Sequence, residues 1–411
     1  MLYQRNITQE IVAALQDNPV VLINGARQTG KSTLVAHLLN DFHQAEYYTF
    51  DDMATLASAT QDPAGFVANL PEKVVIDEVQ RVPEIFLSIK QYVDQNRQPG
   101  RFLLTGSSNA LALPQIADSL AGRMEICTIW PLSQGELQST RESFIDKVFQ
   151  RQELQFKTQL NQAQWIEKFL TGSYPEAIVR ADLKRRSRWY KSYITAILQR
   201  DVKSLANIEK ILELPNILNL LAERSGNLLN TADISRILGI KATTLKRYIA
   251  LLTQVFLVTF IPAWFNNKEK SLTKTPKVYI NDTGLLCYLR GIDHDYLITN
   301  KQPHGAILEN FVIMELLKQM SWSLLEVKLY HFRTQAGIEV DCVLAANNGQ
   351  IVGIEVKASN TITKSDFNGL KKLAEISGSK FVQGILLYSG EKILPFGEKL
   401  FAVPVAAIWE S

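Results

Sequence analysis

The stretch VVLINGARQTGKSTLVAHLL, residues 20–39, places a glycine-rich loop between an apolar strand and a helix. Its glycines, lysine and serine have the GxxxxGKS spacing of a P-loop. Such a loop turns its amide groups toward phosphate oxygens, while Lys31 reaches the β- and γ-phosphates and the Ser32 hydroxyl ligates Mg²⁺. We therefore expect ATP and Mg²⁺ to bind here. The residues assigned to the nucleotide are Gly25, Ala26, Arg27, Gln28, Thr29, Gly30, Lys31, Ser32 and Thr33.

A second acidic motif follows about 45 residues later, in VVIDEVQ at residues 74–80. Asp77 and Glu78 end an apolar strand, as in a Walker B motif. We expect Asp77 to orient Mg²⁺ and Glu78 to polarise the attacking water. Binding of a nucleotide alone does not require Glu78, so the pair predicts hydrolysis.

Polar residues also follow the strand in LLTGSSNAL, residues 103–111. One of Ser107, Ser108 and Asn109 is expected to contact the γ-phosphate or the water, unless the segment is only a turn rich in helix-capping residues. Arg123 and Arg200 are candidate arginine fingers, acting within one chain or across a subunit interface. The sequence does not choose between them, and a monomer, a dimer or a larger homo-oligomer stays open.

Short apolar segments alternate with helical patterns through the first 130 residues, which predicts an α/β domain with a parallel sheet covered on both faces. The expected strands are 19–24, 47–50, 73–77, 101–105 and 125–130.

Composition excludes several classes of protein. The 411 residues are 46% hydrophobic and carry a net charge of +3, so a nucleic-acid surface must be local. Three scattered cysteines exclude a disulfide framework. The chain has neither an apolar run of about 18 residues nor the start of a signal peptide, so we expect a cytoplasmic protein without membrane contact.

The middle of the chain is predicted to be helical and locally basic. Residues 180–203 hold eight basic and two acidic residues, which is either a solvated face or a phosphate-contacting surface. Residues 230–252 predict two helices joined at Gly239, with Thr231 as the first cap and Ile234, Ile237 and Leu238 facing inward. In this helix-turn-helix the residues expected to contact DNA are Lys241, Thr243, Thr244, Lys246 and Arg247. The alternative is a winged helix used only for packing.

Two strands are predicted near the C-terminus, at 339–345 and 351–358. A three-residue loop with Gly349 in the left-handed conformation pairs Cys342 with Ile354 and Leu344 with Val352, which separates apolar from charged side chains. In that register Asp341 lies opposite Glu355, and Glu339 lies opposite Lys357. A two-residue turn would mix the two faces.

The cluster of Asp341, Glu355 and Lys357 resembles the D…ExK motif of PD-(D/E)xK nucleases. The resemblance implies that the carboxylates bind Mg²⁺, or Mn²⁺ in its place, that Lys357 orients the attacking water, and that Glu309 supplies a further acidic ligand. The alternative is a solvated strand face with a Glu339–Lys357 ion pair.

Taken together, GARQTGKST, FDDMA, VVIDEVQRVPEIF, FLLTGSSN, LAGRMEI and WPLSQGEL resemble the prokaryotic AAA-type ATPases that carry a C-terminal domain of unknown function. This implies an ATPase core at 1–135, a helical lid or connector at 136–210, a winged helix at 211–265 and a restriction-endonuclease-like α/β domain at 266–411. The expected function is ATP hydrolysis coupled to binding of nucleic acid, with DNA as the expected partner and with cleavage by the last domain. The alternatives are a nucleotide-gated regulator that does not cleave, and a protein-remodelling ATPase.

Overall fold

The computed structural model describes residues 3–107, 120–202, 213–266 and 275–411. Contacts divide the chain into two compact units, each described here by itself. The first comprises Met1–Leu132 and Thr253–Phe256, and the second comprises Ser133–Leu252 and Leu257–Ser411. No helix in the described ranges is long and apolar enough to cross a membrane.

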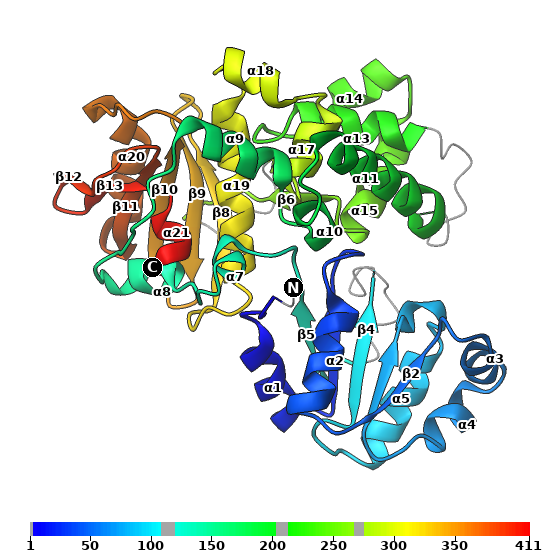
Figure 1. The fold of residues 1–411 in the computed structure, drawn as a ribbon. Helices are drawn as coiled ribbons and strands as arrows, with labels where there is room; N and C mark the ends of the chain where they lie inside the picture. Colours follow the sequence, from blue (N-terminus) through cyan, green and yellow to red (C-terminus); the bar gives the residue numbers. More distant parts are fainter. Residues whose placement is uncertain (1–2, 108–119, 203–212, 267–274) are drawn as a thin grey trace. The chain divides into compact units, whose positions relative to one another are not determined.

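The first unit contains a five-stranded parallel sheet in the order β2-β3-β4-β1-β5 (Figure 1), as the alternating pattern predicts. Its strands are β1 (Val20–Asn24), β2 (Glu46–Thr49), β3 (Val74–Asp77), β4 (Phe102–Gly106) and β5 (Met124–Thr128). Its helices are α1 (Thr8–Asp17), α2 (Lys31–Asp41), α3 (Met53–Gln61), α4 (Pro63–Ala68), the short 3₁₀ helix η1 (Val79–Arg81) and α5 (Ile85–Gln95).

Both faces of this sheet are covered. Val20 and Leu22 of β1 belong to the apolar cluster that includes Ile85 and Ile89 of α5. Successive side chains on a strand point to opposite faces, so Val21 and Ile23, which are equally buried, face the other side. This explains why the strands are continuously apolar. The loop after β1, an internal strand between β4 and β5, is therefore held on a rigid layer.

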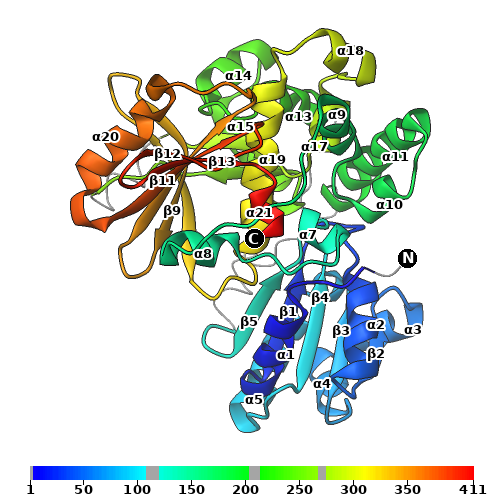
Figure 2. The same cartoon turned by 60° about the vertical axis from the view of Figure 1, so that its left-hand side comes forward.

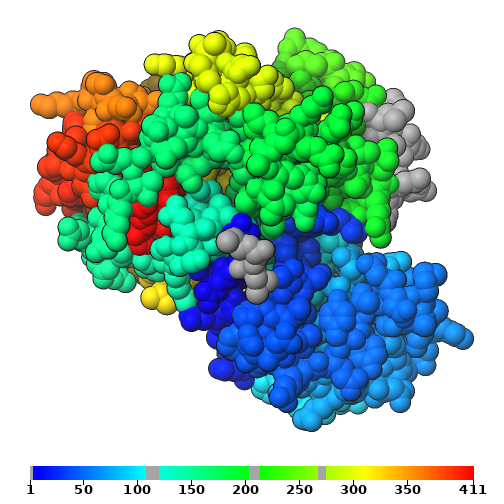
Figure 3. Space-filling view, viewed as in Figure 1, coloured from blue at the N-terminus to red at the C-terminus, as the bar shows by residue number. Residues whose placement is uncertain are grey.

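The second unit begins with helices and a two-stranded antiparallel sheet, β6–β7. In chain order its first elements are α7 (Gln134–Leu137), α8 (Phe144–Gln150), α9 (Gln162–Thr171), α10 (Pro175–Ile178), α11 (Leu183–Ala196), the π-helix η3 (Ile197–Val202), α13 (Leu214–Glu223), α14 (Thr231–Leu238), α15 (Ala242–Gln254), β6 (Val258–Ile261), β7 (Lys277–Ile280), α17 (Thr283–Leu289) and α18 (His294–Thr299). The green surface in Figure 3 includes the part of the chain around α11.

A six-stranded mixed sheet completes this unit, in the order β12-β13-β11-β10-β9-β8. Figures 1 and 2 show α19 and α20 on opposite faces of it. The elements are α19 (His304–Gln319), β8 (Val327–Arg333), β9 (Glu339–Ala346), β10 (Ile351–Lys357), η5 (Lys364–Phe367), α20 (Asn368–Ser377), η6 (Gly378–Lys380), β11 (Phe381–Tyr388), β12 (Leu394–Gly397), β13 (Leu400–Pro404) and α21 (Ala407–Glu410).

The predicted register of the β9–β10 hairpin is confirmed. Cys342 pairs with Ile354 and Leu344 with Val352. Gly349 has φ 87°, the left-handed conformation that the three-residue loop requires. The ladder between these strands ends at the Cys342–Ile354 pair, just before Asp341 and Glu355.

Candidate functional site

The P-loop connects β1 to α2 and requires glycine at both ends. A Cβ atom on Gly25 would lie 2.2 Å from the carbonyl oxygen of Ile129, and Gly30 has φ 91°. Gly30 is also the N-cap of α2, and glycine has no side chain that could cap the helix. The first-turn N–H groups of α2 are therefore not satisfied by a capping side chain, which suits them to phosphate binding.

Lys31 lies folded against its own loop and is 7% exposed. Its Nζ donates to the carbonyl oxygens of Gly25 at 2.9 Å and Ala26 at 2.8 Å. Arg5, which the sequence analysis missed, donates to the carbonyl oxygens of Thr29 and Trp130, both at 2.7 Å. Arg5 therefore links the loop to a segment 24 residues earlier in the chain. No local motif predicts a contact over that distance. These contacts fit a nucleotide cradle built of backbone amides and one ammonium group.

Asp77 and Glu78 lie at the carboxyl end of β3, as predicted. Asp77 accepts a hydrogen bond from the Tyr47 hydroxyl at 2.7 Å and another from Thr105. Burial and the Asp77 carboxylate raise the pKa of Tyr47, so its hydroxyl remains a donor. An Mg²⁺ ion prefers oxygen ligands of this kind, so the residues present fit the cofactor that the P-loop implies.

The Glu78 carboxylate is held by two side chains. Ser107 Oγ lies 3.2 Å from Glu78 Oε2, and Gln80 Nε2 donates to the same oxygen and to Ser107 at 3.0 Å. Ser107, a candidate sensor, is thus next to the candidate base. Ser108 and Asn109 lie outside the described residues. No motif points to Gln80, although it lies only two residues after Glu78 in the sequence.

The two candidate arginine fingers lie in different units. Arg123 forms an ion pair with Asp94 and donates to the Ala121 carbonyl oxygen at 3.2 Å. Arg200 is exposed on the π-helix η3. The positions of Arg123 and Arg200 do not show which of the two acts as an arginine finger, so both assignments stay predictions.

The predicted helix pair at 230–252 is present as α14 and α15, joined at Gly239 with φ 65°. Ile234 is buried as expected, and Leu245 and Leu252 of α15 are buried as well. Two details were wrong. The cap is Asn230, whose side chain accepts the N–H of Asp233, and not Thr231. Ile237 is 54% exposed and does not face inward, although it lies three residues after the buried Ile234.

The residues assigned to DNA contact lie at the start of α15. Lys241, Thr243, Lys246 and Arg247 are exposed, and Thr244 is half-buried. The antiparallel strands β6 and β7 follow the helix pair in the chain. Two cations therefore face solvent on the first two turns of the second helix.

The predicted carboxylate cluster contains a cation that the sequence analysis missed. Lys277, at the start of β7, is 4% exposed. Its Nζ lies 2.9 Å from Glu309 Oε1 and 3.1 Å from Asp341 Oδ1. Tyr279 also donates to Glu309 Oε1, at 2.7 Å. No spacing rule connects a lysine 64 residues upstream with Asp341, so only the fold reveals this contact.

Charge in this cluster is only partly balanced. Burial and the Asp341 charge raise the pKa of Glu309 to about 7 and that of Glu355 to about 9. Burial lowers the pKa of Lys277, but the charges of Asp341 and Glu309 outweigh it and raise the pKa overall. Glu355 Oε2 is buried and has no hydrogen-bond partner among the described residues.

The other two charged residues of the hairpin face different partners. Lys357 is 44% exposed and lies 3.0 Å from Asp366. Glu339 forms an ion pair with Arg333. The alternative interpretation, a Glu339–Lys357 ion pair, is therefore wrong for the described residues, because each of the two side chains pairs with another charge. Lys357 does not join the Lys277 cluster.

The carboxylates around Lys277 offer oxygen ligands, but their arrangement does not suit a metal ion. Carboxylate oxygens suit Mg²⁺ or Mn²⁺, and Glu355 Oε2 lacks a partner. However, Lys277 already contacts Glu309 and Asp341. Within the described ranges no three His, Cys, Asp or Glu side chains form a group that could hold a metal ion. The residues as placed do not fit the metal.

Residues 17–138 match a family described as an AAA domain. Residues 162–296 and 304–408 match two domains of unknown function, DUF8612 and DUF4143. The chain is 30% identical over 411 residues to the uncharacterized protein Rv2008c of Mycobacterium tuberculosis, covering 99% of this chain and 85% of the relative. The chain belongs to the family of Rv2008c. Its first unit contains a P-loop ATPase domain of the AAA type.

Other proteins are similar to this chain at lower sequence identity. The uncharacterized protein MJ1544 of Methanocaldococcus jannaschii is 23% identical over 392 residues, covering 89% of this chain and 81% of the relative. The Walker-type ATPase paby2304 of Pyrococcus abyssi has a TM-score of 0.43 at 16% identity, covering 70% of this chain and 96% of its own. The RuvB Holliday junction branch migration motor of Thermotoga maritima has a TM-score of 0.31 at 19% identity, covering 62% of this chain and 89% of its own.

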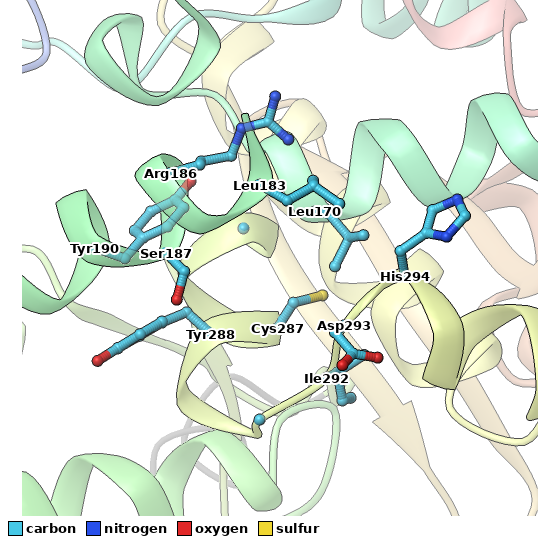
Figure 4. Close-up of a pocket in the computed structure, with 12 residues that line it drawn as sticks. Leu170, Leu183, Arg186, Ser187, Tyr190, Cys287, Tyr288, Ile292, Asp293 and His294 are labelled. Atoms are coloured by element: carbon cyan, nitrogen blue, oxygen red, sulfur yellow. The ribbon is translucent and has the colours of Figure 1, made fainter. Parts of the chain in front are cut away.

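A pocket of about 280 Å³ lies within the region that matches DUF8612 (Figure 4). Burial, with the charge of Asp282, raises the pKa of the Cys287 thiol in its wall to about 12, so the thiol is not a ready nucleophile. Figure 4 shows the Arg186 guanidinium extending away from Cys287. It donates to the carbonyl oxygens of Ala177 and Arg180 at 3.2 and 3.1 Å. We assign this pocket no catalytic role.

Proposed function

We propose that this protein hydrolyses ATP and that hydrolysis controls its attachment to nucleic acid, with DNA as the expected partner. The observation that carries the first part is the placement of Asp77 and Glu78. Both lie at the carboxyl edge of the sheet that also presents the P-loop, and each is oriented by polar side chains. Ligands of parallel α/β sheets bind at this edge.

The groups of the chain would divide the work as follows. The loop amides and the first turn of α2 bind the phosphates, and Lys31 exchanges its carbonyl partners for phosphate oxygens. Ser32 and Asp77 would hold Mg²⁺, which would supply positive charge to the phosphate oxygens. Glu78 orients the attacking water, and Ser107 and Gln80 fix the direction of its carboxylate.

Two variants test hydrolysis. Lys31→Ala should abolish phosphate release. Glu78→Gln should still bind a fluorescent ATP analogue but release phosphate slowly, because the amide cannot accept a proton. Glu84→Gln, which alters an exposed carboxylate of the same unit, is the matched control. Rapid turnover in Glu78→Gln would rule out its role as the base.

Binding of nucleic acid is proposed for two basic surfaces of the second unit. One is the start of α15, with Lys246 and Arg247. The other is an exposed face of α11, which we call the α11 stripe, defined by Lys184, Arg185, Arg188 and Lys191. The described residues offer the four side chains of the α11 stripe no ion pair, whereas the nearby Arg180 and Arg186 pair with Glu176 and Glu167. The stripe spans about 10 Å, which is the length of about three phosphates along one strand.

The start of α15 can be tested by charge reversal. Lys246→Glu with Arg247→Glu should weaken binding of labelled duplex DNA steeply at low salt, since phosphate contacts dominate affinity there. Lys364→Glu with Lys371→Glu is the control, because it makes the same change in net charge at exposed positions of the C-terminal domain. Measurements with and without ATP, on duplex DNA, single-stranded DNA and RNA, identify the preferred partner. Equal binding by both variants would overturn the assignment.

The contacts of the β9–β10 hairpin support the alternative in which the C-terminal domain does not cleave nucleic acid. Lys357 pairs with Asp366, and Asp341 contacts Lys277. Incubation of plasmid DNA with Mg²⁺ or Mn²⁺, with and without ATP, should leave the DNA intact. Cleavage that Asp341→Ala abolishes would favour the nuclease.

A further inference from the structure

A buried ammonium group occupies the carboxylate cluster of the second unit. Lys277 Nζ bridges Glu309 on α19 and Asp341 on β9, at 2.9 and 3.1 Å. We propose that Lys277 takes the place of the metal ion at this cluster, so that the site is an internal ion-pair junction and binds a divalent cation only when Lys277 is removed. This goes beyond the proposed ATPase and does not depend on it.

The hydrogen bonds around Lys277 already use the oxygens that a metal ion would need. Glu309 Oε1 accepts from both Lys277 and the Tyr279 hydroxyl. Asp341 Oδ1 accepts from Lys277, and Asp341 Oδ2 accepts the backbone N–H of Val356 at 3.0 Å. This last bond lies where the β9–β10 ladder has ended, so Asp341 satisfies a backbone group that the ladder leaves open.

Burial explains why Lys277 stays in the cluster. An ammonium group out of water needs paired and hydrogen-bonded partners, and Glu309 and Asp341 supply them. The Lys277 side chain is 5% exposed, whereas that of Lys357, which the nuclease motif would place here, is 44% exposed and pairs with Asp366. The buried position therefore belongs to the lysine of β7.

The junction joins the regions that match the two domains of unknown function. Lys277 and Tyr279 lie in the DUF8612 match, and Glu309 and Asp341 lie in the DUF4143 match. A backbone link lies beside it: Trp264 N donates to the His331 carbonyl oxygen at 2.6 Å. Loss of Lys277 would leave Glu309 and Asp341 without the cation that they contact, beside the buried carboxylate of Glu355. The three carboxylates do not form a metal-binding group as placed. Without Lys277 they would be free to turn toward one ion, and carboxylate oxygens suit Mn²⁺ or Mg²⁺.

Binding of Mn²⁺ to the full-length, nucleotide-free protein tests the proposal by calorimetry and by the electron paramagnetic resonance of free Mn²⁺. The wild-type protein should show no saturable site that depends on Asp341. Lys277→Met should gain one Mn²⁺ per chain, and Lys277→Met with Asp341→Asn should lose it. Lys372→Met removes a lysine that pairs with Glu375 on the surface, and it should gain nothing.

Wild-type protein that binds Mn²⁺ at a site abolished by Asp341→Asn would overturn the proposal. Thermal unfolding gives a second measurement: Mn²⁺ should raise the midpoint of Lys277→Met but not that of the wild type, because a ligand stabilises only the state that binds it. A folded Lys277→Met with no response to Mn²⁺ would also overturn it. If Lys277→Met does not fold, Lys277→Gln replaces it in both measurements. Binding of Mn²⁺ by the wild-type protein at a site that depends on Asp341 would overturn the proposal in either case. ATP turnover, measured separately, distinguishes a failure here from a failure of the ATPase assignment.

Discussion

Two hydroxyl groups from neighbouring parts of the first sheet hold the carboxylate of Asp77. Tyr47 on β2 donates to Oδ2 at 2.7 Å, and Thr105 on β4 donates to Oδ1. A carboxylate held in one orientation loses less freedom when Mg²⁺ binds. We predict that Tyr47→Phe raises the Mg²⁺ concentration for half-maximal ATP turnover about 5-fold, because one hydrogen bond contributes about 1 kcal/mol.

Titration of ATP hydrolysis with Mg²⁺ checks this prediction. Tyr48→Phe is the matched control, because the Tyr48 hydroxyl donates to exposed Glu46 at 3.3 Å. The control should keep the wild-type Mg²⁺ dependence. The same dependence in Tyr47→Phe would show that the hydroxyl does not position Asp77.

Glu142 makes the stability of the second unit depend on pH. Its Oε1 accepts the N–H of Gly135 at 2.7 Å, and burial with the Glu315 charge raises its pKa to about 8. Below about pH 4.5 the carboxyl is protonated in both folded and unfolded chains. Between about pH 4.5 and 8 only the folded chain keeps the proton, so the Glu142 contribution to stability falls as pH rises.

In the wild type this effect lowers the free energy of unfolding by up to about 1.4 kcal/mol for each pH unit between about pH 4.5 and 8. We predict that Glu142→Gln removes this pH dependence. Glutamine keeps an oxygen acceptor for Gly135 and carries no charge. Urea unfolding of both proteins at about pH 5 and about pH 8 measures the change. Equal pH slopes in the two proteins would show the prediction to be wrong.

The α11 stripe allows a prediction at the scale of one helix. Lys184 and Arg188 lie four residues apart, so they are neighbours on one face. If both contact phosphates, Lys184→Gln with Arg188→Gln should lower the slope of log affinity against log salt by about 2, since each contact releases about one counterion. Lys364→Gln with Lys371→Gln should leave the slope unchanged. A slope that changes in neither variant would exclude the stripe from the nucleic-acid interface.

Elements with a local pattern were predictable, and contacts between distant elements were not. The β9–β10 register followed from the separation of charged and apolar side chains, and the structure has it. The P-loop, Asp77 and Glu78 followed from motifs on single strands. Arg5, Tyr47 and Lys277 were missed because each acts on a residue at least 24 positions away. The exposed Ile237 was misplaced because an apolar residue on a short helix does not by itself identify the buried face.

At the scale of the whole molecule, the segments predicted as connector, winged helix and nuclease-like domain form one compact unit. The C-terminus explains part of this. The Ser411 carbonyl oxygen accepts the N–H of Ser143 at 2.7 Å, and Trp409 is buried with its ring centre 6.1 Å from that of Trp165. Gln383 Nε2 donates to the Val148 carbonyl oxygen at 2.7 Å. The C-terminal six-stranded sheet and the helix after it therefore pack against residues of the α8 and α9 segments, more than 200 positions earlier in the chain.

This interlocking predicts how pieces of the chain behave. A fragment of residues 266–411 should be soluble only in a loosely packed form or should aggregate, because Trp409 and the strand β11 lose the side chains that cover them. A fragment of residues 133–411 should unfold cooperatively in urea, and co-expression of 133–265 with 266–411 should restore a folded complex. Near-ultraviolet circular dichroism and urea unfolding distinguish these states. Cooperative unfolding of 266–411 alone would mean that the nuclease-like segment has a sufficient core of its own and that its contacts with α8 and α9 are dispensable.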